Sequence, residues 1–178
     1  MRFKGLLIAV LILLAGCGSK EGITTDDLSL VKLDDEKAKV YYGMQREEVE
    51  KILGEPDEST KLYNVYESGV QVLYRDNKVV RLSIGEDAAN QFKTAGGAAI
   101  GSTKEQLTEI YGDKFIKPNG EQNLDYLYDP ENNEYVESFE KVDRNLLERC
   151  YLVSMMFDND NKVDAITLSD YKAAVMMR

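Results

Sequence analysis

The chain has no histidine, so the side chains that could act as a nucleophile, an acid or a base include its two cysteines, 32 carboxylates and 11 tyrosines. Without histidine the chain lacks the commonest general base and metal ligand, which excludes Ser-His-Asp and Cys-His nucleophile arrangements. It has neither a Gly-x-Ser-x-Gly elbow nor a phosphate-binding glycine loop. The acids are typical of a solvated surface, although composition alone leaves a glycosidase-like carboxylate pair open. We therefore expect a protein that is not an enzyme and that needs no cofactor.

Charge and acidic motifs give no sign of a metal or of nucleic acid. Asp158-Asn159-Asp160-Asn161 superficially looks like a calcium loop, but the Asp-x-Asp-x-Asp-Gly series with a distal Glu is missing. We expect an ordinary polar turn there and no metal site. The net charge of −10 and the lack of a Lys/Arg cluster argue against nucleic acid as a partner, because phosphate backbones are bound by clustered basic residues.

Cys17 is the residue whose surroundings predict a covalent modification. Two basic residues and an apolar run over residues 6–15 precede it, as in a cleavable signal. The run is too short for a transmembrane helix, which needs about 20 apolar residues. Leu14-Ala15-Gly16-Cys17 resembles the lipobox of bacterial lipoproteins. The resemblance implies a signal peptide over residues 1–16, cleavage before Cys17, and lipid attachment to its thiol.

Lipidation would place the protein on the extracytoplasmic side of the cell membrane, or on the outer membrane of an organism with two membranes. Residues 17–38 are mostly polar and charged, which predicts a lipid-bearing tether. Leu28, Leu30, Val31 and Leu33 leave open a short docked element in the second half of this stretch.

Once Cys17 carries lipid, the chain holds no two cysteines that could form an intramolecular disulfide. Cys150 stands in an apolar, strand-like run, Arg149-Cys150-Tyr151-Leu152-Val153. We therefore interpret it as a buried, inert thiol rather than a reactive one.

An internal repeat indicates the fold class. Residues 43–54 align without gaps onto residues 101–112, and both stretches have apolar residues at i, i+3 and i+4. This spacing predicts two short amphipathic helices, near 44–53 and 102–111. A glycine follows each helix where a left-handed cap is expected, and Ser102 with Glu105 fits a capping box at the second.

Residues 76–79 and 160–163 both read Asp-Asn-Lys-Val and separate strand-like runs, which predicts two β-hairpins. The predicted strands cover residues 70–75, 79–84, 151–157 and 163–168, with earlier strands at 62–66 and 124–128. The fold class that follows is α+β, two tandem repeats that each pack a short helical element on an antiparallel sheet. The repeats cover residues 39–88 and 89–178, and the second has an inserted acidic segment near 129–149.

The glycine-bounded motifs resemble those of a known family. Tyr42-Gly43-Met44, with the stretch that ends in Gly54-Glu55-Pro56, and the matching stretch from Thr94 to Gly112 are similar to SmpA/OmlA-type lipoprotein domains and to the tandem domains of beta-lactamase inhibitory proteins. The similarity covers about residues 40–170. It implies two helix-on-sheet units whose sheets form a continuous curved surface, and a function in protein binding.

Tyrosine and arginine side chains on the predicted strands are the candidate protein-binding residues, because both supply large contact areas at interfaces. Tyrosine also favours half-buried strands, which is an equally good interpretation. A register slip of one residue would exchange the two faces of a strand. The inward face is predicted to hold Leu73, Val80, Leu82, Ile84, Ile166 and Leu168. The candidates for the exposed face are Val72, Tyr63, Tyr74, Arg81, Tyr126 and Tyr128.

We therefore expect a lipid-anchored, non-catalytic protein-binding or scaffold lipoprotein, which binds an extracytoplasmic protein through a sheet face and loops. The alternative is a module that binds a small molecule or cell-wall fragment between the two repeats. A deep apolar cavity would favour the alternative, and a shallow, tyrosine-bearing concave face would favour protein binding.

Overall fold

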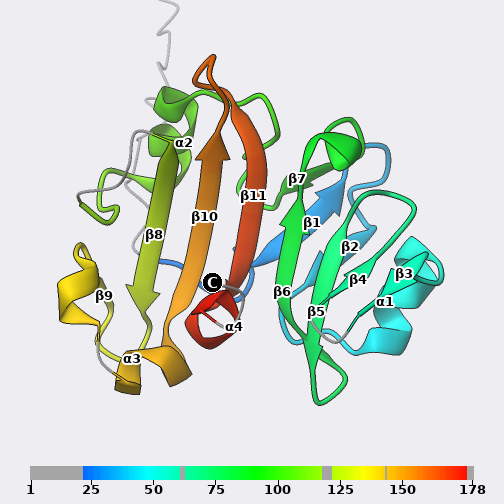
Figure 1. Cartoon of the computed structure of the whole chain (residues 1–178), viewed down its shortest axis with the longest axis horizontal. Coiled ribbons are helices and arrows are strands. Elements are labelled where there is room, and N and C mark those ends of the chain that lie inside the picture. The colour runs from blue at the N-terminus through cyan, green and yellow to red at the C-terminus, as the bar shows by residue number, and fades with distance from the viewer. Residues whose placement is uncertain (1–21, 61–62, 118–121, 143, 176–178) are drawn as a thin grey trace, which may run out of the picture.

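A computed structural model defines residues 22–60, 63–117, 122–142 and 144–175. Within them, four short α-helices pack on two antiparallel sheets, one of three strands and one of eight (Figure 1). The predicted α+β class is thereby confirmed. The predicted signal peptide over 1–16 and the lipid-bearing Cys17 lie outside the described residues.

The large sheet has the strand order β3-β4-β5-β6-β11-β10-β8-β9, and all neighbours are antiparallel. Both predicted hairpins are present, as β5-β6 and β10-β11. Their turns contain Asp76, Asn77 and Asn161 at positive φ, which explains why Asp and Asn stand there. The strands are Glu58–Ser59 (β3), Asn64–Val65 (β4), Gln71–Arg75 (β5), Lys78–Ile84 (β6), Asn123–Asp129 (β8), Glu134–Tyr135 (β9), Tyr151–Phe157 (β10) and Val163–Asp170 (β11).

The two predicted units share this sheet, because β6 of the first unit pairs with β11 of the second. The pairing sets Leu82 opposite Leu168 and Arg81 opposite Ser169. One continuous sheet therefore spans both units, and residues far apart in the sequence lie on one surface.

The second half of the predicted tether over residues 17–38 contains a docked strand, which is the alternative that its apolar residues left open. Ser29–Lys32 forms β1, the central strand of the small sheet, between β2 (Lys39–Tyr41) and β7 (Phe92–Thr94). Leu28 and Leu30 are fully buried. Burial of one leucine contributes about 1.5–3 kcal/mol, so these residues stabilise the docked strand.

Both predicted amphipathic helices are present, as α1 (Arg46–Leu53) and α2 (Lys104–Tyr111). Gly54 and Gly112 follow them with φ 86° each, in the left-handed region that glycine adopts without steric cost.

The start of α2 differs from the prediction. Its N-cap is Thr103, whose hydroxyl accepts the Gln106 N–H at 3.3 Å, while the Gln106 side chain accepts the Thr103 N–H at 2.8 Å. The prediction placed the N-cap one residue too early, at Ser102, because the capping-box pattern fits both Ser102 with Glu105 and Thr103 with Gln106.

The two helices have equivalent local connections. The Gly43 N–H donates to the Val79 carbonyl at 2.8 Å, and the Gly101 N–H donates to the Val163 carbonyl at 2.7 Å. The two glycines have φ 85° and 84°. These matched contacts agree with a duplication, which itself stays a prediction from the sequence.

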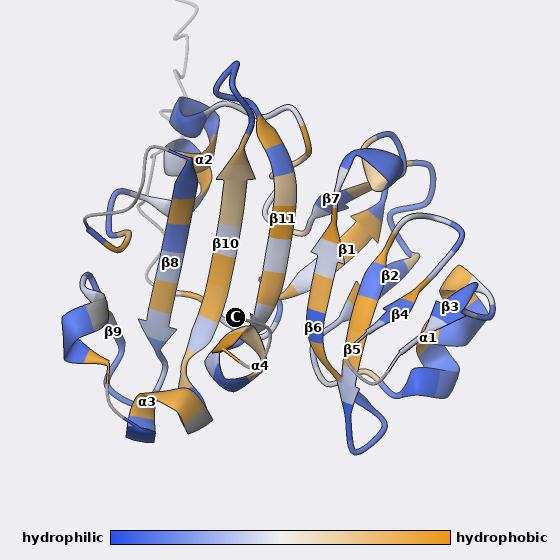
Figure 2. Cartoon of the chain, in the orientation of Figure 1, coloured by the Kyte–Doolittle hydropathy of each residue, from blue (hydrophilic) through white to orange (hydrophobic). Residues whose placement is uncertain are grey.

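One face of the large sheet, called the inner face here, is apolar. Val72, Leu82, Leu168, Val153 and Tyr126 stand opposite one another across five strands, and all five are buried. The alternation of apolar and polar residues is visible as bands along β6 and β11 in Figure 2. The inner face packs on side chains of the small sheet, α1 and α2: Leu30, Val40, Phe92, Val49 and Leu107.

The predicted acidic insert near 129–149 contains β9, a 3-10 helix η2 (Phe139–Lys141) and α3 (Arg144–Arg149). With α4 (Tyr171–Val175) it covers one end of the opposite face of the sheet, over a second, smaller core that includes Cys150. Cys150 is buried, as predicted. A further 3-10 helix, η1 (Glu86–Ala88), follows β6.

Candidate binding face

A row of polar side chains crosses the other face of the large sheet, called the outer face here. The strand register sets each member opposite the next. The Ser83 and Thr167 hydroxyls lie 3.2 Å apart, and the Ser154 hydroxyl donates to Asp125 at 2.5 Å. Because the central side chains are short, they leave a hollow on the sheet. The row consists of Gln71, Ser83, Thr167, Ser154 and Asp125.

Arg81 extends along β6 over this row. Its Nε donates to the Ser83 Oγ at 3.1 Å, and its Nη2 donates to the Thr167 Oγ1 at 3.4 Å. Burial lowers the pKa of the Arg81 guanidinium from its ordinary value. Among the described residues, no carboxylate forms an ion pair with it. The outer face therefore presents a partly desolvated cation held by hydroxyl groups.

A pocket of about 200 Å³ lies beside Arg81 on this face. Ser154 and Thr167 of the polar row line it, together with Ala174 of α4. Met156, which is 51% exposed, also lines the pocket. The pocket is lined by Arg81, Asn123, Leu152, Ser154, Met156, Thr167 and Ala174.

Asp170 holds α4 in place at the edge of the pocket. Its Oδ1 accepts the Ala173 N–H at 2.7 Å, and its two oxygens accept Arg75 Nη1 and Nη2 at 3.0 and 3.2 Å. The Tyr42 hydroxyl donates to it at 3.0 Å. Asp170 thus joins the start of α4 to β5 and to the segment after β2.

Two of the five predicted site residues lie at the outer face. Tyr63 and Arg81 line a shallow depression together with Gln71, Leu73 and Ser83, next to the pocket. Tyr74 is half-buried and packs against the inner core instead. Its hydroxyl lies 2.6 Å from the Tyr66 hydroxyl, and burial raises the pKa of Tyr74.

Tyr126 and Tyr128 were wrongly assigned to an exposed face. They are 0% and 5% exposed and belong to the inner core. The Tyr126 hydroxyl donates to the Gly112 carbonyl at 2.8 Å, so even its polar end is used inside the fold. Their phase on β8 matches that of buried Leu124, which the pairing with β10 establishes.

The inward and outward residues of β5 were also exchanged in the prediction. Val72 is buried opposite Leu82, whereas Leu73 lies opposite Arg81 at the outer face. The pairing of β5 with β6 shifts register between Leu73 and Tyr74. Beyond this shift, each residue of β5 points to the face opposite to the one that a regular hairpin would give it. This irregularity is why the pattern of Leu82 and Ile84 did not predict the phase of β5.

The sequence interpretation missed the short polar residues that line the pocket. The sequence signal for these residues is their alternation with inward-facing residues. Along β10, Ser154 and Met156 alternate with Val153 and Met155, and in β11 Thr167 lies between two buried residues. Serine and threonine have no distinctive sequence pattern by themselves, whereas tyrosine is a residue type enriched at protein interfaces.

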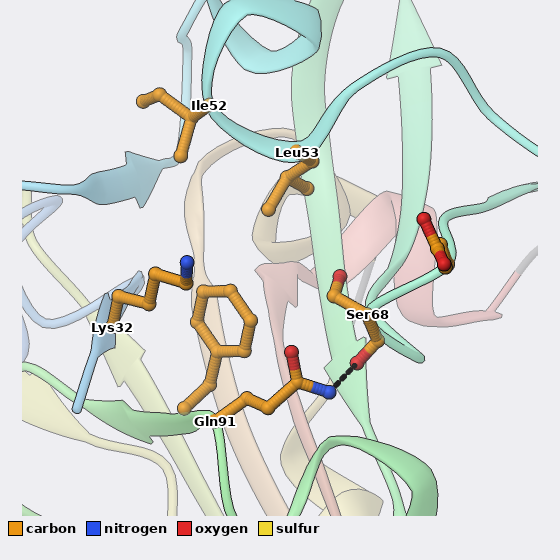
Figure 3. Close-up of a pocket in the computed structure, with 7 residues that line it drawn as sticks. Lys32, Ile52, Leu53, Ser68 and Gln91 are labelled. Atoms are coloured by element: carbon orange, nitrogen blue, oxygen red, sulfur yellow. Dashed lines mark hydrogen bonds between the residues drawn. The ribbon is translucent and has the colours of Figure 1, made fainter. Parts of the chain in front are cut away.

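A second cleft, of about 310 Å³, lies between the end of α1, β1 and the turn before β5 (Figure 3). The Gln91 side-chain amide donates to the Ser68 carbonyl at 3.3 Å. The Ser68 hydroxyl is buried without a hydrogen-bond partner in the described part of the chain. The cleft is lined by Lys32, Ile52, Leu53, Glu67, Ser68, Gln91 and Phe92.

Two features are absent from the described ranges. No cluster of three or more potential Asp, Glu, Cys or His ligands for a metal is found there. Nor does any helix in this part of the chain have the length and apolar character needed to cross a membrane.

Comparisons with known proteins give one distant structural likeness. No family model matches the chain. No curated protein matches it. A similar solved structure is that of a DUF4309 family protein (YjgB) from Bacillus subtilis subsp. subtilis str. 168, with a TM-score of 0.38 and 15% identity over 71% of this chain and 78% of that chain.

Proposed function

We propose that this protein is a lipid-anchored, non-catalytic binding protein that holds an extracytoplasmic protein partner on the outer face of its large sheet. The observation that carries the proposal is Arg81, a partly buried cation on an open polar face, bonded to hydroxyls and to no carboxylate of the described chain. Arginine is enriched where proteins meet, and a desolvated charge gains most from a partner of opposite sign.

The size of the outer-face pocket supports a protein partner over a free small molecule. Pockets for small molecules usually enclose about 300–1,000 Å³. The pocket beside Arg81 has about 200 Å³. A single side chain of a partner suits this volume, with the rest of the partner resting on Met156 and the surrounding sheet.

Lipid attachment at Cys17 would keep the folded part of the chain close to the membrane surface. Ile23 is already buried in the fold. The chain from Cys17 to Ile23 spans at most about 20 Å when fully extended. The proposed partner is therefore an extracytoplasmic protein that can reach the surface of the cell membrane, or of the outer membrane in a cell with two membranes.

A relationship to tandem SmpA/OmlA-type and beta-lactamase-inhibitory-protein-like domains is part of the same proposal. The equivalent hydrogen bonds of Gly43 and Gly101, each to a valine after a hairpin turn, support a duplicated unit. One sheet shared by both units supports a binding surface that spans them.

Site-specific photo-crosslinking in intact cells tests the proposal. A photoreactive residue at Met156, on the outer face, should give a covalent adduct with one protein that mass spectrometry identifies. The matched control is the same residue at Lys51, an exposed position on α1. The proposal fails if Met156 gives no adduct in the lipidated protein, or the same adducts as Lys51.

The alternative, a module for a small molecule or cell-wall fragment, is favoured by one observation. The Ser68 hydroxyl is buried beside the second cleft with no hydrogen-bond partner among the described residues, and a bound polar ligand would satisfy it (Figure 3). A mixture of soluble muropeptides should then raise the melting temperature of the protein, and Ser68→Ala should reduce the effect. No shift at millimolar concentration would end this alternative.

A further inference from the structure

We propose that Arg81 is a receptor for one acidic side chain, an Asp or Glu that the protein partner inserts into the outer-face pocket. The inference rests on the proposed function and names the chemistry that the partner must present. It follows from the hydrogen bonds, the charge pairing and the walls of the pocket.

The hydroxyls of the polar row orient the guanidinium without neutralising it. Ser83 binds Nε at 3.1 Å and Thr167 binds Nη2 at 3.4 Å. A guanidinium has more N–H groups than these two bonds use, and it matches a carboxylate in a two-pronged geometry. Because the side chain is already held by the sheet, a carboxylate would bind with little loss of side-chain freedom.

Among the partly buried arginines of the described residues, Arg81 differs from the other three in having no carboxylate partner. Arg46 pairs with Glu50 at 2.8 Å, Arg75 with Asp170 at 3.0 Å, and Arg149 with Asp129 at 2.6 Å. The charge of each of these three arginines is therefore balanced by a carboxylate of the same chain.

Within the described ranges Arg81 has only hydroxyl partners, although the chain carries 32 acidic residues. Partial burial of a guanidinium without an anion is unfavourable, which agrees with the lowered pKa of Arg81. A partner's carboxylate would supply the missing charge.

The pocket walls and the net charge favour an acidic side chain over other anions. Leu152, Met156 and Ala174 provide apolar surface for the methylene groups of a Glu or Asp. A phosphate carries more negative charge, and a chain with a net charge of −10 repels it more strongly. A carboxylate on a short apolar stem therefore fits both the charge and the walls.

NMR spectroscopy of the full-length protein in nonionic detergent micelles tests the inference with three defined probes. N-acetyl-glutamate N-methylamide carries the acidic side chain, N-acetyl-glutamine N-methylamide is its neutral isostere, and N-acetylalanine presents a main-chain carboxylate. The glutamate probe should shift the Arg81 Nε–Hε signal and the amide signals of Ser83 and Thr167. The glutamine probe should bind at least tenfold more weakly.

Two arginine variants complete the test, one that alters the proposed receptor and one that is its matched control. Arg81→Gln should weaken binding of the glutamate probe at least tenfold, and Arg144→Gln, at an exposed position of α3, should leave it unchanged. Equal binding of the glutamate and glutamine probes to the unaltered protein would overturn the inference, even if Arg81→Gln fails to fold. Tighter binding of N-acetylalanine would overturn it in favour of a chain terminus.

The failure of this inference is distinguishable from failure of the proposed function. Crosslinking from Met156 depends on where the partner lies and not on the charge that it presents. An adduct at Met156, together with no preference for the acidic probe, would retain the binding face and reject the carboxylate receptor.

Discussion

Asp170→Asn should destabilise the protein by about 2–3 kcal/mol, because the carboxylate is the point where α4, β5 and the chain after β2 meet. Each of its oxygens accepts two hydrogen bonds: Oδ2 from Arg75 and Tyr42, and Oδ1 from Arg75 and Ala173. Asparagine has nearly the same shape but replaces one oxygen by an NH₂ group. In either orientation of the amide, two donors lose their acceptor.

The magnitude follows from the exposure of the two partners. The Asp170 side chain is 7% exposed and that of Arg75 is 35% exposed. A hydrogen bond to a charged group contributes about 1.5–3 kcal/mol, and removing one partner of a fully buried ion pair costs about 3–5 kcal/mol. Water reaches Arg75 and restores part of this loss, which gives the lower value of about 2–3 kcal/mol.

Urea denaturation followed by tyrosine fluorescence measures the effect, because the chain has 11 tyrosines and no tryptophan. A loss of this size should also lower the melting temperature by about 5–10 °C. Asp160→Asn, in the exposed turn between β10 and β11, is the matched control and should stay within about 0.5 kcal/mol of the unaltered protein. An Asp170→Asn variant as stable as this control would refute the role of Asp170.

Leu82→Ala should cost about 2–5 kcal/mol because Leu82 is buried in the inner row, whereas Leu73→Ala on the outer face should cost under about 1 kcal/mol; equal costs in urea denaturation would contradict the assignment of faces. Burial raises the pKa of Tyr111 to about 12, above the value of 10.0 expected when unfolded. Its contribution to stability is therefore complete below pH 10 and is lost as the pH rises towards 12, so the urea midpoint should fall between pH 10 and pH 12. Although burial acts in the opposite direction, hydrogen bonds from Arg149 hold the pKa of Asp129 below its usual value. That contribution is complete above about pH 4 and is lost as the pH falls further; an ordinary Asp129 pKa in an NMR titration would contradict it.

Local patterns in the sequence predict the local elements well. The i, i+3, i+4 spacing and the closing glycines locate α1 and α2 to within two residues at each end. The paired Asp-Asn-Lys-Val turns locate both hairpins, and the apolar run around Cys150 predicts its burial. Each of these features depends on residues close together in the chain.

Features that depend on distant residues are where the sequence interpretation is wrong. Leu28 and Leu30 are buried in a core that also contains residues of the large sheet, and β1 is a central strand because β7, some sixty residues later, pairs with it. The inward phase of Tyr126 depends on its position opposite Val153 in β10. Neither pairing leaves a local signal, and without them a tyrosine in a strand fits either face equally well.

The candidate site depends on the same long-range register. Arg81 was predicted correctly as an exposed-face residue, but the hydroxyls that hold it come from β6 and β11, which are joined by no short turn. Ser83 and Thr167 become a site only when the two hairpins share one sheet.

The affinity of the crosslinked partner for two threonine variants tests the central claim most directly. Thr167→Tyr fills the outer-face pocket with a bulky side chain that suits a strand, whereas Thr108→Tyr makes the same change on α2, away from that face. The account predicts that Thr167→Tyr weakens binding of the purified partner at least tenfold and that Thr108→Tyr does not. Unchanged affinity for Thr167→Tyr, in a protein as stable as the control, would contradict the assignment of the outer face as the binding surface.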